Sequence, residues 1–170
     1  HPLIGREGER NVLRHLLLHE QRRLVTLCGA GGMGKTHLAL DVATALASHF
    51  RDGAAFVALT ALPSATHLPG AVAEALHLPL GAGDPQEQVL TLLAPRQLLL
   101  VLDDFAPFLN RDNGAAVQWV NRLLQQAPQV QVLVTSRERL RLSGERIFEL
   151  GGLALPSLTQ PPESADAVLL

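Results

Sequence analysis

The clearest chemical signal in the sequence is a glycine-rich stretch that ends in a lysine and a threonine. Residues 29–36 read Gly-Ala-Gly-Gly-Met-Gly-Lys-Thr and fit the pattern G-x-x-x-x-G-K-[ST]. Glycines let the backbone turn several N–H groups toward one point, and a helix that begins at Gly34 would add its own unpaired N–H groups. We expect Lys35, the only lysine in the chain, to contact the β- and γ-phosphates of a nucleotide, and the Thr36 hydroxyl to ligate Mg²⁺. The candidate nucleotide-binding residues here are Gly29, Gly31, Gly32, Met33, Gly34, Lys35, Thr36 and the following His37.

Two acidic residues follow the most apolar run of the chain. Residues 98–102 are apolar without alternation, which is typical of a strand covered on both faces, and Asp103 and Asp104 come next. At the carboxyl end of a parallel strand they would face the crevice where ligands bind in such sheets. We expect Asp103 to hold Mg²⁺, through water, and Asp104 to orient or deprotonate an attacking water. The alternative for either residue is a cap on the next helix.

An arginine stands at the equivalent place after another apolar run. Residues 132–134 are apolar, and Thr135, Ser136 and Arg137 follow them. The planar guanidinium of Arg137 suits phosphate oxygens, so at this edge it would contact the γ-phosphate and report its presence. We therefore group Arg137 with Lys35 and Asp104 as candidate catalytic residues. Other arginines follow soon after, and we interpret them as solvated charges balanced by nearby glutamates.

Strands that alternate with helices indicate βαβ units on a parallel sheet. The predicted strands are residues 24–28, 54–59, 97–102, 130–135 and 146–150. Helical periodicity predicts helices from Glu9 through Leu17, from Gly34 to about Ser48, from Pro85 through Leu93 behind an Asp84 cap, from Val117 through Leu124, and a short one over Glu138–Leu142.

Composition limits what the chain can do. It has 170 residues, of which 47% are hydrophobic and 18% charged, and this suits one α/β domain with a single sheet. The net charge of −2 argues against nucleic-acid or anionic-membrane binding, and one cysteine excludes an intrachain disulfide. The longest aliphatic run is far below the roughly 18 residues of a membrane helix, and no signal segment is visible, so we expect a cytoplasmic protein. The absence of lysine outside the glycine-rich stretch disfavours a guanine-reading motif.

Taken together, the motifs resemble those of NB-ARC domains, which belong to the STAND class of signal-transduction ATPases and are related to the AAA+ group. Leu3-Ile4-Gly5-Arg6-Glu7, the glycine-rich stretch, residues 99–104 and residues 134–140 occur in the order seen in that family, closest to its bacterial branch. The resemblance covers residues 3 to about 153. It implies a P-loop NTPase three-layer αβα sandwich with a five-stranded parallel sheet of order 2-3-4-1-5.

The resemblance also implies a function. The segment matching Ile4, Gly5 and Arg6 contacts adenine in relatives, so the expected ligands are ATP, ADP and Mg²⁺. Relatives act as switches that are closed with ADP and open and self-assembling with ATP, and their hydrolysis is slow. We expect residues 1–155 to form the nucleotide-binding domain and 156–170 a linker and the start of a helical subdomain. Sensor and effector domains would complete the parent protein, and the isolated domain would be monomeric.

Two other functions stay open. One is a dedicated ATPase or phosphotransferase with real turnover, which phosphate release at saturating Mg²⁺-ATP would reveal. The other is an interaction module whose glycine-rich loop binds nothing, which nucleotide retained after purification would exclude.

Overall fold

Five parallel strands form one sheet in the middle of the molecule. The computed structural model describes residues 6–30 and 34–151, and the predicted linker at 156–170 lies outside these residues. The spatial order of the strands is β2-β3-β4-β1-β5, with all four neighbouring pairs parallel, as the predicted order 2-3-4-1-5 requires. The strands are β1 (Leu24–Cys28), β2 (Ala54–Ala58), β3 (Leu98–Asp103), β4 (Val130–Ser136) and β5 (Glu145–Glu149).

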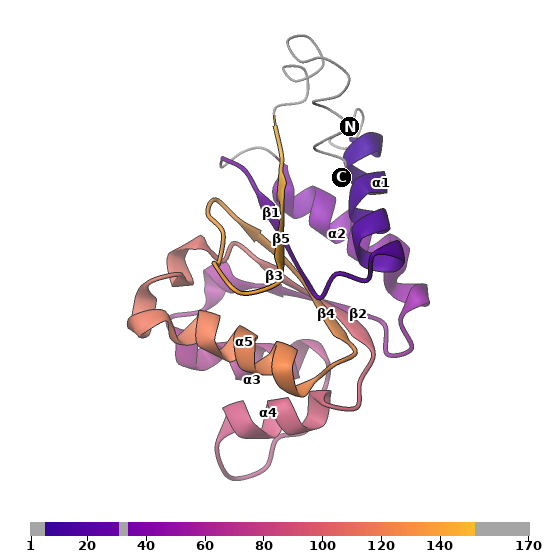
Figure 1. Ribbon diagram of the computed structural model, residues 1–170. Helices are drawn as coiled ribbons and strands as arrows, with labels where there is room; N and C mark the ends of the chain where they lie inside the picture. The colour runs from indigo at the N-terminus through magenta and orange to yellow at the C-terminus, as the bar shows by residue number, and fades with distance from the viewer. Residues whose placement is uncertain (1–5, 31–33, 152–170) are drawn as a thin grey trace.

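Helices cover both faces of this sheet, which gives three layers (Figure 1). The helices α1 and α2 pack on one face, and α3, α4 and α5 pack on the other. The helices are α1 (Glu7–Arg14, continued by a π turn at His15–His19), α2 (Lys35–Leu46), α3 (Leu68–Ala75), α4 (Pro85–Leu93) and α5 (Ala115–Gln126). Short 3₁₀ turns occupy Ala47–His49, Leu59–Ala61, Ala65–His67, Ala106–Phe108 and Arg111–Gly114.

The two-sided burial predicted for the central strands is confirmed. In β3, Leu98, Leu100 and Leu102 face the α3, α4 and α5 layer, while Leu99 and Val101 face the α1 and α2 layer. Every residue of β1 and β3 is buried. Because side chains alternate across a strand, only an uninterrupted apolar run can fill both cores. The architecture is therefore the α/β sandwich that the apolar runs predict.

The prediction of a short helix over Glu138–Leu142 is wrong. The structure has no helix there, and Arg141 takes the left-handed value φ = 67°. The backbone N–H groups of Leu140 and Arg141 are bonded to the side chain of Glu145 instead of to helical carbonyls. A tertiary acceptor has replaced the helical ones that the periodicity suggested.

Helix α3 was not predicted, and its sequence explains why. It begins with Leu68, Pro69 and Gly70, two of which are poor helix formers. Proline is tolerated in a first turn because the N–H that it lacks has no helical partner there. Burial of Val72 and Ala73 against the sheet then stabilises the helix.

None of the helices in the described ranges combines the length and the apolar character needed to cross a bilayer.

Candidate functional site

The candidate residues converge where β1, β3 and β4 end. The glycine-rich loop leaves β1 and enters α2, Asp103 ends β3, and Thr135 and Ser136 end β4. Strand register places Thr135 beside Leu27 and Ser136 beside Cys28, at the end of β1. Because parallel strands point their carboxyl ends to one edge, three loops far apart in sequence meet there.

Lys35 folds back over the start of the glycine-rich loop. Its Nζ donates hydrogen bonds to the carbonyl oxygens of Gly29 at 2.6 Å and Ala30 at 2.9 Å. Burial lowers the pKa of the Lys35 ammonium, Asp104 and Asp103 oppose this shift, and Arg137 adds to it. The charges of Asp103, Asp104 and Arg137 therefore all act on the Lys35 ammonium, which places them in its neighbourhood.

A chain of hydrogen bonds joins the three loops. The Thr36 hydroxyl lies 3.0 Å from both carboxylate oxygens of Asp103 and donates to them. From the other side, the Thr135 hydroxyl donates to Asp103 Oδ1 at 2.7 Å. Asp103 is 7% exposed and Thr135 1% exposed, so these bonds form in surroundings of low polarity, where they are stronger than in water. Asp103 is therefore held from both sides.

Asp104 has an unusual backbone. Its φ is 66°, a left-handed value that costs a non-glycine residue roughly 1–2 kcal/mol. The Thr135 hydroxyl accepts a hydrogen bond from the Asp104 N–H at 2.8 Å, and the Thr135 carbonyl accepts one from Phe105 N–H at 2.9 Å. Thr135 thus holds the backbone of the turn at Asp104 and Phe105 through its hydroxyl and its carbonyl.

The alternative that these acids cap the next helix does not fit the structure. Asp103 lies within β3, and the turn that follows, Ala106–Phe108, has Phe105 at its N-cap position and no side-chain cap. Sequence reasoning missed Thr135. The available signal was a hydroxyl residue at the end of a buried strand, where a polar group needs a partner.

The structure explains why two positions of the loop are glycine. Gly34 precedes α2 with φ = 81°, and its carbonyl accepts the first bond of the helix, from Leu38 N–H. A Cβ on Gly29 would lie 3.0 Å from the carbonyl oxygen of Leu150, so the close approach of the loop to the end of β5 needs glycine. His37 lies exposed on the first turn of α2. Other predicted contacts, Gly31, Gly32, Met33, Ile4 and Gly5, lie outside the described residues.

Arg6 is buried beside the start of α2. It is 4% exposed, Nη1 donates to the Gly151 carbonyl at 3.5 Å, and Nη1 lies 3.7 Å from a Glu9 carboxylate oxygen. A Cβ on Gly34 would come within 3.8 Å of its Nη2. The side chain therefore connects the amino-terminal segment, the loop exit and the end of β5. The burial of this side chain was not predicted from the sequence.

Arg137 is exposed and directly follows β4. The Ser136 hydroxyl fixes the chain around it, because Ser136 Oγ donates to the Glu138 carbonyl and accepts from the Glu138 N–H at 3.1 Å. Arg137 also lines a hollow of about 370 Å³ that reaches Cys28 at the end of β1. The structure thus brings Arg137 to the edge where Lys35, Asp103 and Asp104 lie.

The donor set fits Mg²⁺ and does not fit a caged transition metal. Thr36 and Asp103 offer a hydroxyl and a carboxylate, and Mg²⁺ is usually held by one or two such oxygens together with water and substrate phosphates. Within the described ranges, no three His, Cys, Asp or Glu residues come together as a metal cluster.

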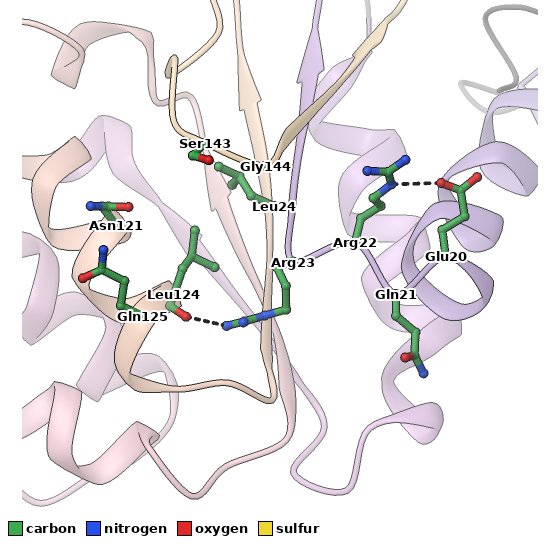
Figure 2. A pocket seen from close by; sticks show the side chains of 10 residues that line it. All are labelled: Glu20, Gln21, Arg22, Arg23, Leu24, Asn121, Leu124, Gln125, Ser143 and Gly144. Atoms are coloured by element: carbon green, nitrogen blue, oxygen red, sulfur yellow. Dashed lines mark hydrogen bonds and ion pairs between the residues drawn. The ribbon is translucent and has the colours of Figure 1, made fainter.

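A second hollow, of about 770 Å³, lies at the end of the sheet opposite the candidate nucleotide site (Figure 2). It is bordered by the turn before β1, by α5 and by Ser143 and Gly144. Its central cation, Arg23, donates from Nε to the Val130 carbonyl at 2.8 Å and from Nη2 to the carbonyls of Leu124 and Ala127. Arg23, which directly precedes β1, thus joins this strand to the end of α5 and to the start of β4, and we assign it a structural role.

Comparisons with known proteins agree with this geometry. The model of the family described as "NACHT domain" matches residues 23–161. A candidate HTH-type transcriptional regulator of Mycobacterium bovis is 35% identical over 136 residues, which are 79% of this chain and 15% of that protein. An uncharacterized protein of Mycobacterium tuberculosis is 33% identical over 153 residues, 89% of this chain and 37% of that protein. The chain thus spans well under half the length of these curated relatives.

Solved structures share the fold at low sequence identity. The ORC1 protein of Aeropyrum pernix, in complex with DNA, is 20% identical with a TM-score of 0.66 over 84% of this chain and 44% of that one. A STAND protein with a tetratricopeptide repeat sensor from Pyrococcus horikoshii is 19% identical, with a TM-score of 0.57 over 92% of this chain and 24% of that one. At these identities the likeness establishes a common fold.

Proposed function

This chain belongs to the NACHT domain family, and from that premise we propose that it is the ATP- and ADP-binding core of a STAND-class switch of the NB-ARC kind. The observation that carries the proposal is the hydrogen-bonded path from Thr36 through Asp103 to Thr135. It links the glycine-rich loop to the strand end that bears Arg137. A change at a bound phosphate would therefore reach both the loop and β4.

In this proposal different residues of the site bind different parts of the ligand. The loop N–H groups and the Lys35 ammonium bind the β- and γ-phosphates, and Thr36 and Asp103 hold Mg²⁺, which when bound neutralises phosphate charge. Adenine lies near Ile4, Gly5 and Arg6. Burial of Arg6 beside Gly34 supports a place for this segment next to the loop.

Hydrolysis in this proposal is slow and resets the switch. Asp104 orients the attacking water, and Arg137 contacts the γ-phosphate. The exposure of Arg137 and its influence on the Lys35 pKa support this placement. With ADP bound, Arg137 would lose its ligand, and the loop after β4 would change its contacts.

We also propose a regulatory setting for the domain. The HTH regulators named among the relatives support a role in transcription control, in which this domain transmits a signal between sensor and effector domains and self-assembles with ATP. Residues 1–155 would form the nucleotide-binding domain and residues 156–170 the linker to the next one.

Identification of the bound nucleotide tests the proposal. The purified chain is denatured, and the released nucleotide is identified by chromatography, with the Lys35→Ala variant as control. We expect adenine nucleotide from the wild type and much less from the variant. Nucleotide-free wild type that also fails to take up ADP or ATP would overturn the proposal and favour an interaction module.

Phosphate release separates the switch from the alternative enzyme. At saturating Mg²⁺-ATP we expect turnover far below the roughly 1 to 10³ s⁻¹ of ordinary enzymes. Turnover within that range would instead identify a dedicated ATPase or phosphotransferase.

A further inference from the structure

We propose that Glu145 is a positioning residue for the nucleotide site, because its carboxylate fixes the loop 137–144 that begins with Arg137. The inference rests on the nucleotide-binding function proposed above. It assigns to Glu145 the discrimination between nucleoside triphosphate and diphosphate, which it exerts through Arg137 and without contacting the ligand.

Three donors converge on the Glu145 carboxylate. Oε2 accepts from the Thr26 hydroxyl at 2.5 Å and from the Leu140 N–H at 2.8 Å, and Oε1 accepts from the Arg141 N–H at 2.8 Å. Thr26 is a fully buried residue in the middle of β1. The carboxylate therefore fastens the loop to the strand that leads into the glycine-rich stretch.

The loop depends on these bonds because it has no helix to supply acceptors. Arg141 has φ = 67°, a left-handed value that is strained for a residue other than glycine. Its N–H is one of the two backbone N–H groups that donate to the Glu145 carboxylate. Without the carboxylate, two backbone donors would lose their partner and the strained residue would be released.

The other end of the loop is also fixed, which leaves few residues free to move. Ser136 bonds both backbone groups of Glu138, and the Leu140 side chain is buried in the core on the α3, α4 and α5 side of the sheet. Only residues 137–139 project outward between these two anchors, and each is exposed. Where Arg137 points is therefore set by the anchors on either side, of which Glu145 is the one that carries a charge.

The chemistry requires a carboxylate at this position. Ionised Glu145 only accepts hydrogen bonds, whereas glutamine of the same shape has one accepting oxygen and an NH₂ group that donates. In Glu145→Gln, either the Leu140 or the Arg141 N–H would face another donor. Glu149→Gln is a matched control, because Glu149 lies on the same face of the same strand and its carboxylate makes no hydrogen bond within the described residues.

The test compares nucleotide affinities and loop protection in the 170-residue chain. Affinities for Mg²⁺-ADP and for a non-hydrolysable Mg²⁺-ATP analogue are measured by calorimetry for wild type, Glu145→Gln and Glu149→Gln. We expect Glu145→Gln to weaken analogue binding about tenfold and ADP binding by less than about twofold, as expected for the loss of a charge-assisted contact. Hydrogen exchange at Leu140 and Arg141 should become faster in Glu145→Gln alone.

Thr26→Val covers the case in which Glu145→Gln does not fold, since it removes one donor and keeps the shape. It should shift the ratio of the two affinities in the same direction by a smaller factor. An unchanged ratio in the folded variants, or equal weakening of both ligands, would overturn the role of Glu145. If wild type binds neither ligand, the proposed function fails instead, so the two failures are distinguishable.

Discussion

The Thr36 hydroxyl, on the first turn of α2, donates to both carboxylate oxygens of Asp103, at the end of β3, over 3.0 Å. The two residues are 67 positions apart in sequence, and the fold brings them together because β1 and β3 end at the same edge. A hydroxyl and a carboxylate at this distance could both contact one hydrated Mg²⁺ ion.

Asp103→Asn should therefore weaken the magnesium-dependent part of nucleotide binding. Asparagine keeps the shape and removes the charge that attracts the ion. We expect affinity for Mg²⁺-ADP to fall about tenfold, with little change when a chelator is present. Fluorescence titration with and without magnesium measures this. Equal losses in both conditions would mean that Asp103 acts on the fold and not on the ion.

The left-handed backbone of Asp104 predicts an order of stabilities. Glycine adopts φ = 66° without strain, whereas a β-branched residue is strongly disfavoured there. Asp104→Gly should leave the free energy of unfolding within about 1 kcal/mol of wild type, and Asp104→Val should lower it by about 1–2 kcal/mol more. Urea denaturation measures both. If the two variants were equally stable, the backbone of this turn would be different from the one described.

Arg137→Ala should reduce the preference for triphosphate. Because the guanidinium is placed to contact a γ-phosphate, its removal should weaken binding of a non-hydrolysable ATP analogue about tenfold and leave ADP affinity almost unchanged. Arg139→Ala is the control, since Arg139 is another exposed arginine of the same loop. A similar effect of both variants would point to general electrostatic attraction and not to a specific contact.

Cys28 predicts a pH dependence of stability. Burial, with the carboxylates of Glu149 and Glu145, raises the pKa of the Cys28 thiol from 9.0 to about 11. A group whose pKa is higher when folded contributes stability that is complete below its unfolded pKa and is lost as pH rises through the folded one. Wild type should therefore lose stability relative to Cys28→Ala between pH 9 and 11. Parallel unfolding curves for the two proteins across that range would contradict this.

Much of the fold follows from local sequence, and the loop after β4 shows where local reasoning stops. An uninterrupted apolar run such as residues 98–102 has few alternatives to a strand buried on both faces, so β3 could be predicted. The Glu138–Leu142 segment has a helical pattern, but the acceptor of its N–H groups is Glu145. A tertiary hydrogen bond of this kind has no periodic signature.

The residues of the candidate site likewise fall into those that local sequence predicts and those that depend on tertiary contacts. Two of its residues, Lys35 and Thr36, can be recognised because they end a motif of fixed spacing. Asp103 can be recognised because it directly follows the apolar run of a predicted strand. The role of Thr135 depends on β4 lying between β3 and β1, and the burial of Arg6 depends on the packing of α1 beside α2. Such contacts join segments about 30 to 145 residues apart, and no local pattern records them.

A calorimetric titration of Mg²⁺-ADP into the wild-type chain and into Lys35→Ala tests whether the glycine-rich loop and Lys35 bind nucleotide phosphates. Lys35 supplies charge-assisted hydrogen bonds worth about 1.5–3 kcal/mol each, so the wild type should bind with one site per chain and the variant at least about tenfold more weakly. Equal affinity of the two folded proteins, or no heat of binding from the wild type, would show that Lys35 does not bind a nucleotide phosphate.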